Sequence, residues 1–309
     1  MSATRVVIPA AGFGTRFLPI TKSMPKEMIP LVDKPAIQYV VEEAIASGVK
    51  EFVMVVSREK KAIEDHFDIG HDGNNDLINK DGQEILNTFA KMLKGVQFTS
   101  IRQQEQLGLG HAVWMARHLF RKEKGYFTVM LPDDVILGSP PALAQLLKIA
   151  AQERGSVVAV KEVPIEEVSR YGVIDIKKQL SPNLFQVKEL IEKPQPSKAP
   201  SNLAIIGRYV LSTDLFDAFD EVSEGASGEL QLTDAIQRLL CSGERVFAYR
   251  VQGKVLDVGT KLGWIKSNIE ASLHHPVYGP YVREFLEKMD VEQALMRGMA
   301  AAKVQPRVR

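Results

Sequence analysis

Residues 5–30 read RVVIPAAGFGTRFLPITKSMPKEMIP. The segment opens with an apolar run, Val6 to Ile8, that is typical of a buried strand, and continues into a loop that contains Gly12 and Gly14. A glycine-rich turn directly after a strand lies at the edge of an open α/β sheet, where ligands bind. Glycine lets backbone N–H groups approach a phosphate closely. We interpret the segment as a phosphate-binding loop, with a plain tight turn as the alternative.

Two familiar phosphate-binding loops do not fit these residues. A dinucleotide fingerprint requires a third glycine where Phe17 stands, and a Walker loop requires a Gly-Lys-Ser/Thr sequence that this segment lacks. The loop instead carries Arg16, and Lys22 and Lys26 follow in a proline-rich stretch. Arginine offers phosphate a planar fork and lysine a compact charge. Three such cations beside a glycine-rich turn favour a triphosphate ligand.

The order of the predicted elements indicates an α/β fold. From residue 5 to residue 153, strand-like runs alternate with helical patterns, which predicts a mostly parallel sheet covered on both faces. Residues 68–95 interrupt this alternation and are interpreted as an insertion. From residue 156 to residue 211, strand patterns follow one another, which predicts a mixed, partly antiparallel subregion. We expect a Rossmann-like three-layer domain over residues 1–275.

The remaining residues, 276–309, are expected to form a C-terminal helical tail. An apolar stripe runs along its helical pattern, formed by Phe285, Leu286, Met289, Val291, Leu295, Met296 and Met299. Such a stripe has to be covered by the same chain or by another subunit. We therefore expect the tail to contribute to a homo-oligomer contact.

Composition excludes several classes of function. The chain has 309 residues, 25% of them charged, and its net charge of +1 provides no field that would attract nucleic acid. Cys241 is the only cysteine, so neither an intrachain disulfide nor a cysteine-based zinc site can form. No run approaches the ~20 apolar residues of a spanning helix. We expect a cytoplasmic protein without nucleic-acid or membrane partners.

Aspartates from two distant parts of the chain are placed where they could hold a metal ion. Asp133 and Asp134 end an apolar strand pattern, and Asp257 follows another apolar stretch much later in the chain. Magnesium typically takes one or two protein carboxylates, and waters and phosphate oxygens complete its octahedron. The alternative is that these aspartates form turns or cap helices.

Several ordered motifs resemble the signature of the sugar-phosphate nucleotidyltransferase family. The likeness runs from Val6 to about Asn268. Besides the glycine-rich loop, the motifs are Met24-Pro25-Lys26-Glu27-Met28, Leu31-Val32-Asp33-Lys34-Pro35, Gly108-Leu109-Gly110-His111-Ala112, Ile191-Glu192-Lys193-Pro194 and Gly228-Glu229-Leu230-Gln231-Leu232-Thr233-Asp234-Ala235. The resemblance implies the nucleotidyltransferase fold with a strand-rich sugar-binding subregion. It also implies magnesium-dependent transfer of the uridylyl group of UTP to glucose 1-phosphate, giving UDP-glucose and pyrophosphate.

The resemblance assigns roles to individual positions. It implies catalytic phosphate contacts by Arg16, Lys26 and Lys193, nucleotide contacts by Ala10, Ala11, Gly12, Gly14, Glu27, Gln103 and Gly108, sugar contacts by Gly172 and Glu192, and magnesium ligands at Asp133 and Asp257. Asp134 is a candidate for supporting those ligands. We interpret His111 as a helix-packing residue, with a place in the nucleotide site as the alternative, and Glu229 and Asp234 as acidic residues that open a helix.

The implied reaction needs no enzyme nucleophile, because the attacking phosphate oxygen of glucose 1-phosphate is already anionic. We expect in-line attack without a covalent intermediate, supported by positioning and charge cancellation. A thymidylyltransferase that uses dTTP is one alternative, although residues 31–41 and the insertion look closer to the uridylyl branch. A catalytically weak regulatory homologue is another, and it is disfavoured by the presence of Arg16, Lys26, Asp133, Lys193 and Asp257.

Overall fold

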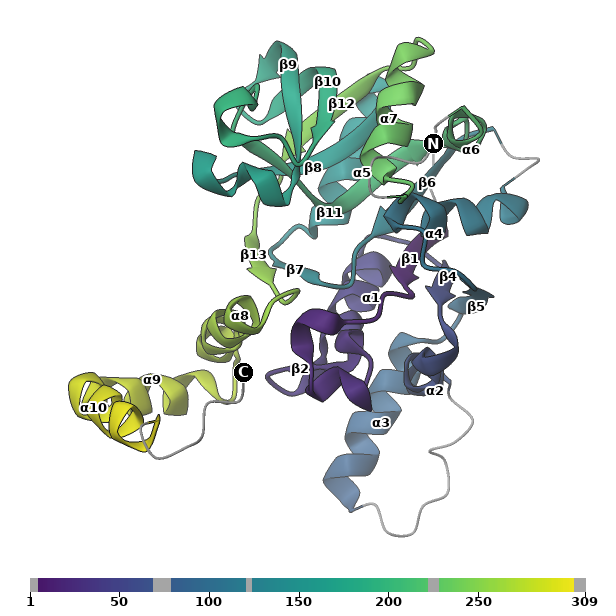
Figure 1. Ribbon diagram of the computed structural model, residues 1–309. Helices are drawn as coiled ribbons and strands as arrows, with labels where there is room; N and C mark the ends of the chain where they lie inside the picture. The colour runs from purple at the N-terminus through teal and green to yellow at the C-terminus, as the bar shows by residue number, and fades with distance from the viewer. Residues whose placement is uncertain (1–4, 69–78, 121–123, 222–227, 303–309) are drawn as a thin grey trace.

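The protein was analysed as a computed structural model that describes residues 5–68, 79–120, 124–221 and 228–302, with side chains up to residue 296. A nine-stranded sheet forms its centre, in the order β5-β4-β1-β6-β11-β8-β12-β10-β9 (Figure 1). Its strands are β1 (Arg5–Ala10), β4 (Glu51–Val56), β5 (Gln97–Arg102), β6 (Tyr126–Met130), β8 (Ser156–Glu162), β9 (Gly172–Ser181), β10 (Leu184–Glu192), β11 (Leu203–Ser212) and β12 (Val246–Arg250).

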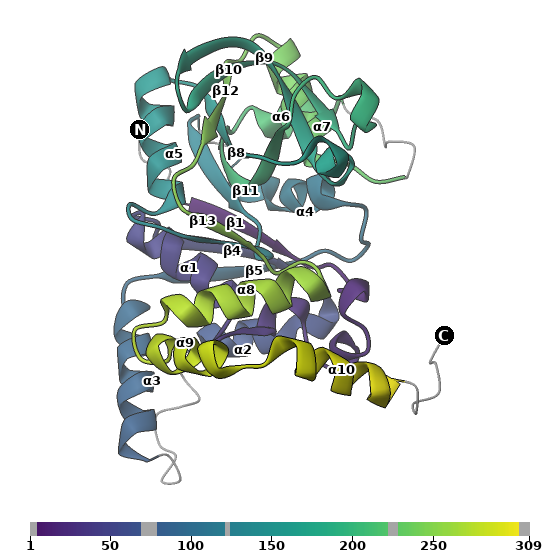
Figure 2. The ribbon, with the colours of Figure 1, turned by 90° about the vertical axis from the view of Figure 1, so that its left-hand side faces the viewer.

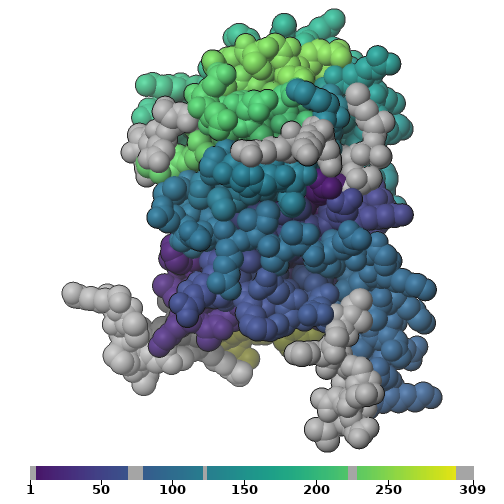
Figure 3. All heavy atoms as spheres, turned by 90° about the vertical axis from the view of Figure 1, so that its right-hand side faces the viewer, coloured from purple at the N-terminus to yellow at the C-terminus, as the bar shows by residue number. Residues whose placement is uncertain are grey.

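The direction of strand pairing changes in the middle of the sheet. Strands β5, β4, β1 and β6 are parallel to one another. Strand β11 then runs antiparallel to both β6 and β8, and the β9–β10 hairpin forms the far edge. The mixed α/β fold with a strand-rich second half is thus confirmed, and parallel pairing dominates the first half alone. Figure 3 shows the same division on the surface, with purple and blue residues below and green residues on top.

Helices cover both faces of the sheet. Alternate residues of β1 point to opposite faces, so that Val6 and Ile8 join one apolar cluster and Val7 joins the other. The first cluster packs under α1, α2 and α5, and the second under α4, α6 and α7 (Figures 1 and 2). These helices are α1 (Ala36–Ala46), α2 (Lys61–Phe67), α4 (Leu109–Met115), α5 (Ala142–Glu153), α6 (Leu215–Phe219) and α7 (Leu232–Cys241).

The predicted insertion is described only in part. Residues 69–78 lie outside the described residues, and the remainder contains helix α3 (Lys80–Met92). Phe89 of α3 packs against Phe67 of α2, with 6.1 Å between the ring centroids, and Phe67 stacks on Phe98 of β5 at 5.0 Å. These aromatic contacts attach α3 to the edge of the sheet.

One ion pair is fully enclosed between the sheet and a helix. Arg208 of β11 has no exposed surface, and its Nη2 donates to Oε2 of Glu43 in α1 at 2.7 Å. Its Nη1 donates to the carbonyl oxygens of Leu131 (3.2 Å) and Gly207 (2.9 Å). Oε1 of Glu43 also accepts from the backbone N–H of Leu143, at the start of α5. The pair therefore connects both helices to the residues that follow β6.

The C-terminal tail is helical, as predicted, and consists of two helices. They are α9 (Gly279–Lys288) and α10 (Val291–Ala302), and Met289, in extended conformation, separates them. Both follow α8 (Lys261–His274), and α9 packs against it (Figure 2). Met299 lies outside the described side chains. No helix in the described residues is long and apolar enough to cross a membrane.

The last helices expose many large apolar side chains. On α8 they recur at the spacing of one helix face, and further ones follow on α9 and α10. They are Leu262, Ile265, Ile269, Leu273, Tyr281, Phe285, Leu295 and Met296. Monomeric proteins rarely leave a large apolar surface uncovered. We propose that this face contacts a second copy of the chain.

The oligomer proposal predicts that Phe285→Glu lowers the mass of the particle in solution, because a charge placed in an apolar contact remains without a partner. Phe285 is 63% exposed in the single chain, so the substitution costs the fold of the monomer little. Glu284→Gln, on the neighbouring exposed position, is the control and leaves the mass unchanged. Light scattering measures the mass, and a full-length chain that is already monomeric contradicts the proposal.

Candidate active site

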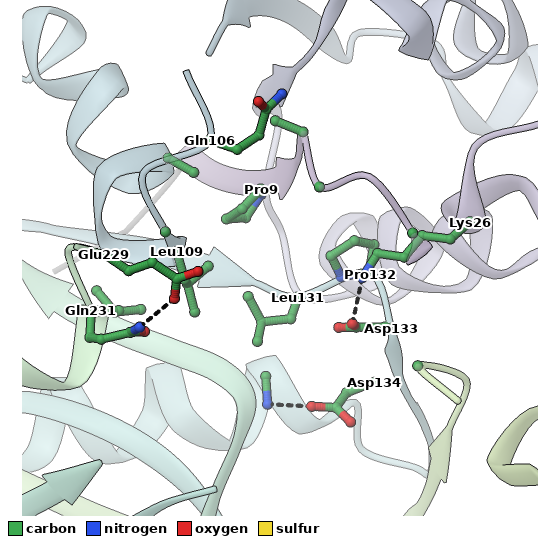
Figure 4. Close-up of a pocket in the computed structure, with 18 of the residues that line it drawn as sticks. Pro9, Lys26, Gln106, Leu109, Leu131, Pro132, Asp133, Asp134, Glu229 and Gln231 are labelled. Carbon is green, nitrogen blue, oxygen red and sulfur yellow. Dashed lines mark hydrogen bonds and ion pairs between the residues drawn. The ribbon is translucent and has the colours of Figure 1, made fainter. Parts of the chain in front are cut away.

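A cavity of about 680 Å³ opens where the parallel half of the sheet meets the strand-rich half. Its lining comes from both halves, as the residues drawn in Figure 4 illustrate. Among the residues predicted for the site, it includes Ala11, Gly12, Gly14, Arg16, Lys26, Glu27, Gln103, Gly108, Asp133, Gly172, Glu192 and Lys193. Ala10 is not in the lining, although Pro9 and Ala11 on either side of it are, and Asp257 approaches the cavity through Gly259.

The absence of a side chain has a different consequence at each of the two glycines of the first loop. Gly14 adopts a left-handed backbone with φ 67°, and a side chain there would lie 3.0 Å from Thr21. Its carbonyl oxygen accepts from Oγ1 of Thr21 at 2.8 Å, so the loop folds back on the segment that carries Lys26. A side chain at Gly12 would meet no atom within 4 Å. Gly12 thus leaves open space that a ligand can occupy.

Lys26 and Asp133 form an ion pair inside the cavity. Nζ of Lys26 lies 2.7 Å from Oδ2 of Asp133 (Figure 4). Burial alone would lower the pKa of Lys26, but Asp133 and Glu27 outweigh it and hold this pKa above 10.5. Burial would raise the pKa of Asp133, and Lys26 overcomes that effect and holds it below 3.8. Both side chains are therefore charged at neutral pH.

Asp257 lies near Asp133 because two short strands pair into a small ribbon, which the sequence analysis did not predict. Strand β7 (Asp134–Leu137) pairs antiparallel with β13 (Lys254–Asp257), and this register sets Asp257 opposite Asp134. A side-chain carbon built on Gly259 would lie 3.3 Å from Oδ2 of Asp133 and also 3.3 Å from Oδ1 of Asp257. Both carboxylates therefore lie next to Gly259, where a side chain would crowd them.

These two carboxylates have the chemistry that a magnesium ion requires. Among the described residues, no group of three His, Cys, Asp or Glu side chains could hold a metal ion. Magnesium prefers oxygen ligands and often uses only one or two from the protein, which Asp133 and Asp257 could provide. Asp134 turns elsewhere, because its Oδ2 accepts from the backbone N–H of Gly207 at 2.8 Å (Figure 4). Burial and the charge of Asp133 raise the pKa of Asp134.

Glu27 lies beneath the loop in a second buried ion pair. Nζ of Lys60 donates to its Oε2 at 2.7 Å, and both residues are almost fully buried. Burial raises the pKa of Glu27, although Lys60 and Lys26 act against this. Its Oε1 is buried without a hydrogen-bond partner among the described residues. Glu27 lines the cavity, but this oxygen is enclosed by protein, and the nucleotide contact of Glu27 stays a prediction.

The predicted sugar-side residues meet on the β9–β10 hairpin. Gly172 pairs with Glu192, and a side chain on Gly172 would lie 3.1 Å from the Glu192 carboxylate. Nζ of Lys193 lies 3.3 Å from Oε1 of Glu192, and Oγ1 of Thr233 donates to Oε2 at 2.7 Å. The absence of a side chain at Gly172 thus keeps the carboxylate accessible from the cavity.

Several lining residues were missed by sequence reasoning. Arg170, two residues before Gly172, lies with Nη2 3.5 Å from Oδ2 of Asp257. Glu229 does not open a helix, because α7 begins only at Leu232, and its carboxylate accepts from Gln231 within the lining (Figure 4). Thr233 lines the cavity as well. Glu229 and Thr233 lie within a recognised motif, and Arg170 precedes the predicted sugar contact Gly172 by two residues; these positions were the available signal.

The chain resembles known proteins over most of its length. A family profile described as nucleotidyl transferase matches residues 5–272. The UTP–glucose-1-phosphate uridylyltransferase of Bacillus subtilis (strain 168) is 44% identical over 283 residues, which is 92% of this chain and 96% of that protein.

Solved structures show the same likeness. A UDP-glucose pyrophosphorylase complexed with UDP-glucose is 37% identical with a TM-score of 0.80, and the match covers 89% of this chain and 100% of that one. The UTP-bound UGPase from Acinetobacter baumannii is 33% identical with a TM-score of 0.83, over 94% of this chain and 100% of that one. The similarity in sequence and the similarity in fold lead to the same conclusion: this chain belongs to the nucleotidyl transferase family.

Proposed function

We propose that the protein transfers the uridylyl group of UTP to glucose 1-phosphate, giving UDP-glucose and pyrophosphate. The observation that carries the proposal is a single cavity with cations from both halves of the chain, Arg16 and Lys26 on one side and Lys193 on the other. Two anionic substrates can meet only where their repulsion is cancelled. The names of the relatives favour uridylyl transfer over the thymidylyl alternative.

The reaction would depend on positioning and charge rather than on a nucleophilic side chain. Gly12 leaves room for the triphosphate, and Arg16 and Lys26 neutralise it. Lys193 neutralises the sugar phosphate, and the Glu192 carboxylate accepts hydrogen bonds from sugar hydroxyls. The phosphate oxygen of glucose 1-phosphate then attacks the α-phosphorus of UTP in line with the departing pyrophosphate. Asp133 and Asp257 would hold magnesium, which supplies further neutralisation of phosphate charge.

The overall proposal predicts that pyrophosphate is released fastest from UTP when glucose 1-phosphate is the acceptor. The measurement is a pyrophosphate-release assay across UTP, dTTP, CTP, ATP and GTP in the presence of magnesium. A preference for dTTP would support the thymidylyl alternative. A protein that binds UTP and glucose 1-phosphate but releases no pyrophosphate would be the regulatory homologue.

Lys26→Ala is predicted to lower kcat by roughly 10²-fold or more, the scale for losing one preorganised electrostatic contact. Lys22→Ala is the matched control: the sequence placed Lys22 among the three cations that favour a triphosphate, but in the structure it is exposed and lies outside the cavity lining. The measurement is steady-state turnover at saturating UTP and glucose 1-phosphate. Equal kcat values for the two variants would reject a catalytic role for Lys26.

Asp133→Asn is predicted to raise the magnesium concentration that gives half-maximal activity, because the amide brings no negative charge to the metal. Removal of divalent cations with EDTA abolishes activity of the parent, and added magnesium restores it. Asp175→Asn on the outer hairpin, where Asp175 pairs with Lys188, is the control. If Asp133→Asn and the parent share one magnesium titration curve, Asp133 is not a ligand.

A further inference from the structure

The amide group of Gln103 has a fixed orientation in the cavity wall. Its Nε2 lies 3.3 Å from the carbonyl oxygen of Gly108 and 2.9 Å from Nδ1 of His111. A carbonyl oxygen can only accept a hydrogen bond, so the amide atom that faces Gly108 has to be the nitrogen. Both hydrogens of this nitrogen are then used within the protein. Among the described residues nothing donates to Oε1, the remaining atom of the amide.

The contact also fixes the state of His111. Because Nε2 of Gln103 donates to Nδ1, the imidazole has to be neutral with its hydrogen on the other ring nitrogen. Burial lowers the pKa of His111 below 6.5, and this effect outweighs the hydrogen bond to the backbone of Glu105. Trp114, on the same helix, stacks against the imidazole at 5.8 Å between ring centroids. The ring therefore has a defined place as well as a defined charge.

We propose that His111 is a positioning residue for base specificity, which holds the Gln103 amide so that Oε1 serves as a hydrogen-bond acceptor for the base. This inference rests on the proposed function and on the nucleotide contacts that the family resemblance implies for Gln103 and Gly108. Uracil carries a hydrogen on N3 and can donate it to Oε1. Cytosine has a lone pair at N3, so two acceptors would face each other without a hydrogen.

The same geometry limits what Gln103 can distinguish. Thymine carries the N3 hydrogen too, so this contact separates uracil and thymine from cytosine. Discrimination between UTP and dTTP then has to come from the 5-methyl group or the ribose 2′-hydroxyl. A site that hydrogen-bonds its substrate rejects a mismatched analogue strongly, because the buried groups of the site are left unpaired. A glutamine that could rotate would lose this effect, since its amide nitrogen could then face N3 of cytosine.

The test compares kcat/KM for UTP and for CTP in His111 variants. His111→Leu removes the acceptor and keeps an apolar side chain of similar size, so the Gln103 amide can rotate. We expect the UTP:CTP ratio to fall about tenfold, the scale of one hydrogen bond. His111→Asn places Oδ1 where Nδ1 stood and restores the ratio. His118→Leu, which changes an exposed histidine further along the chain, leaves the ratio at the parent value.

The outcomes separate this inference from the proposed function. If His111→Leu turns over UTP with the parent UTP:CTP ratio, the role of His111 is overturned and uridylyl transfer stands. If the parent itself does not use UTP, the proposed function fails. Nitrogen-15 NMR of the unsubstituted protein provides a readout that does not depend on the folding of a variant. It should show Nδ1 of His111 without a hydrogen at neutral pH, and a protonated Nδ1 would overturn the inference.

Discussion

A buried guanidinium determines how the layers of this protein meet beside its cavity. Arg208 has no exposed surface, and Glu43 accepts from it with both carboxylate oxygens. Removing two charges from water costs several kcal/mol per ion, so such a pair persists only where its hydrogen bonds are complete. Here they are, because Leu131 and Leu143 take part as well. Asp133 emerges two residues after Leu131, and its position therefore depends on this pair.

Charge compensation is the second constraint on the site. Each carboxylate proposed to bind magnesium already faces a cation of the cavity wall, Lys26 beside Asp133 and Arg170 beside Asp257. Neither aspartate has to carry an isolated charge before substrates arrive, which limits the cost of holding them close together. Under the proposed function, incoming phosphates and metal exchange partners with these pairs. Groups that are oriented in advance need little rearrangement during the reaction, which favours catalysis.

The sequence allowed the α/β class and the glycine-rich loop to be predicted, and most of the predicted site residues do line the cavity, because these depend on local pattern and on ordered motifs. It did not indicate how Asp257 comes near Asp133, since that follows from the pairing of two short strands far apart in the chain. The break at Met289 was missed because the apolar pattern continues across it. His111 was interpreted as a packing residue, because only the folded chain brings Nδ1 to Gln103.

The β9–β10 hairpin has a consequence for how such a protein can diversify. Gly172 and Glu192 lie on this hairpin, and among the described residues no hydrogen bond joins it to the loop from Ala11 to Glu27. Mutations at sites that neither touch nor share a hydrogen-bond partner usually act more independently than mutations of neighbours, and here coupling would pass through the ligands in the shared cavity. Under the proposed function, a lineage can therefore accumulate changes on the hairpin that alter which sugar phosphate is accepted, with less effect on the loop proposed to bind the triphosphate. The specificities for the two substrates could then evolve largely separately within one chain.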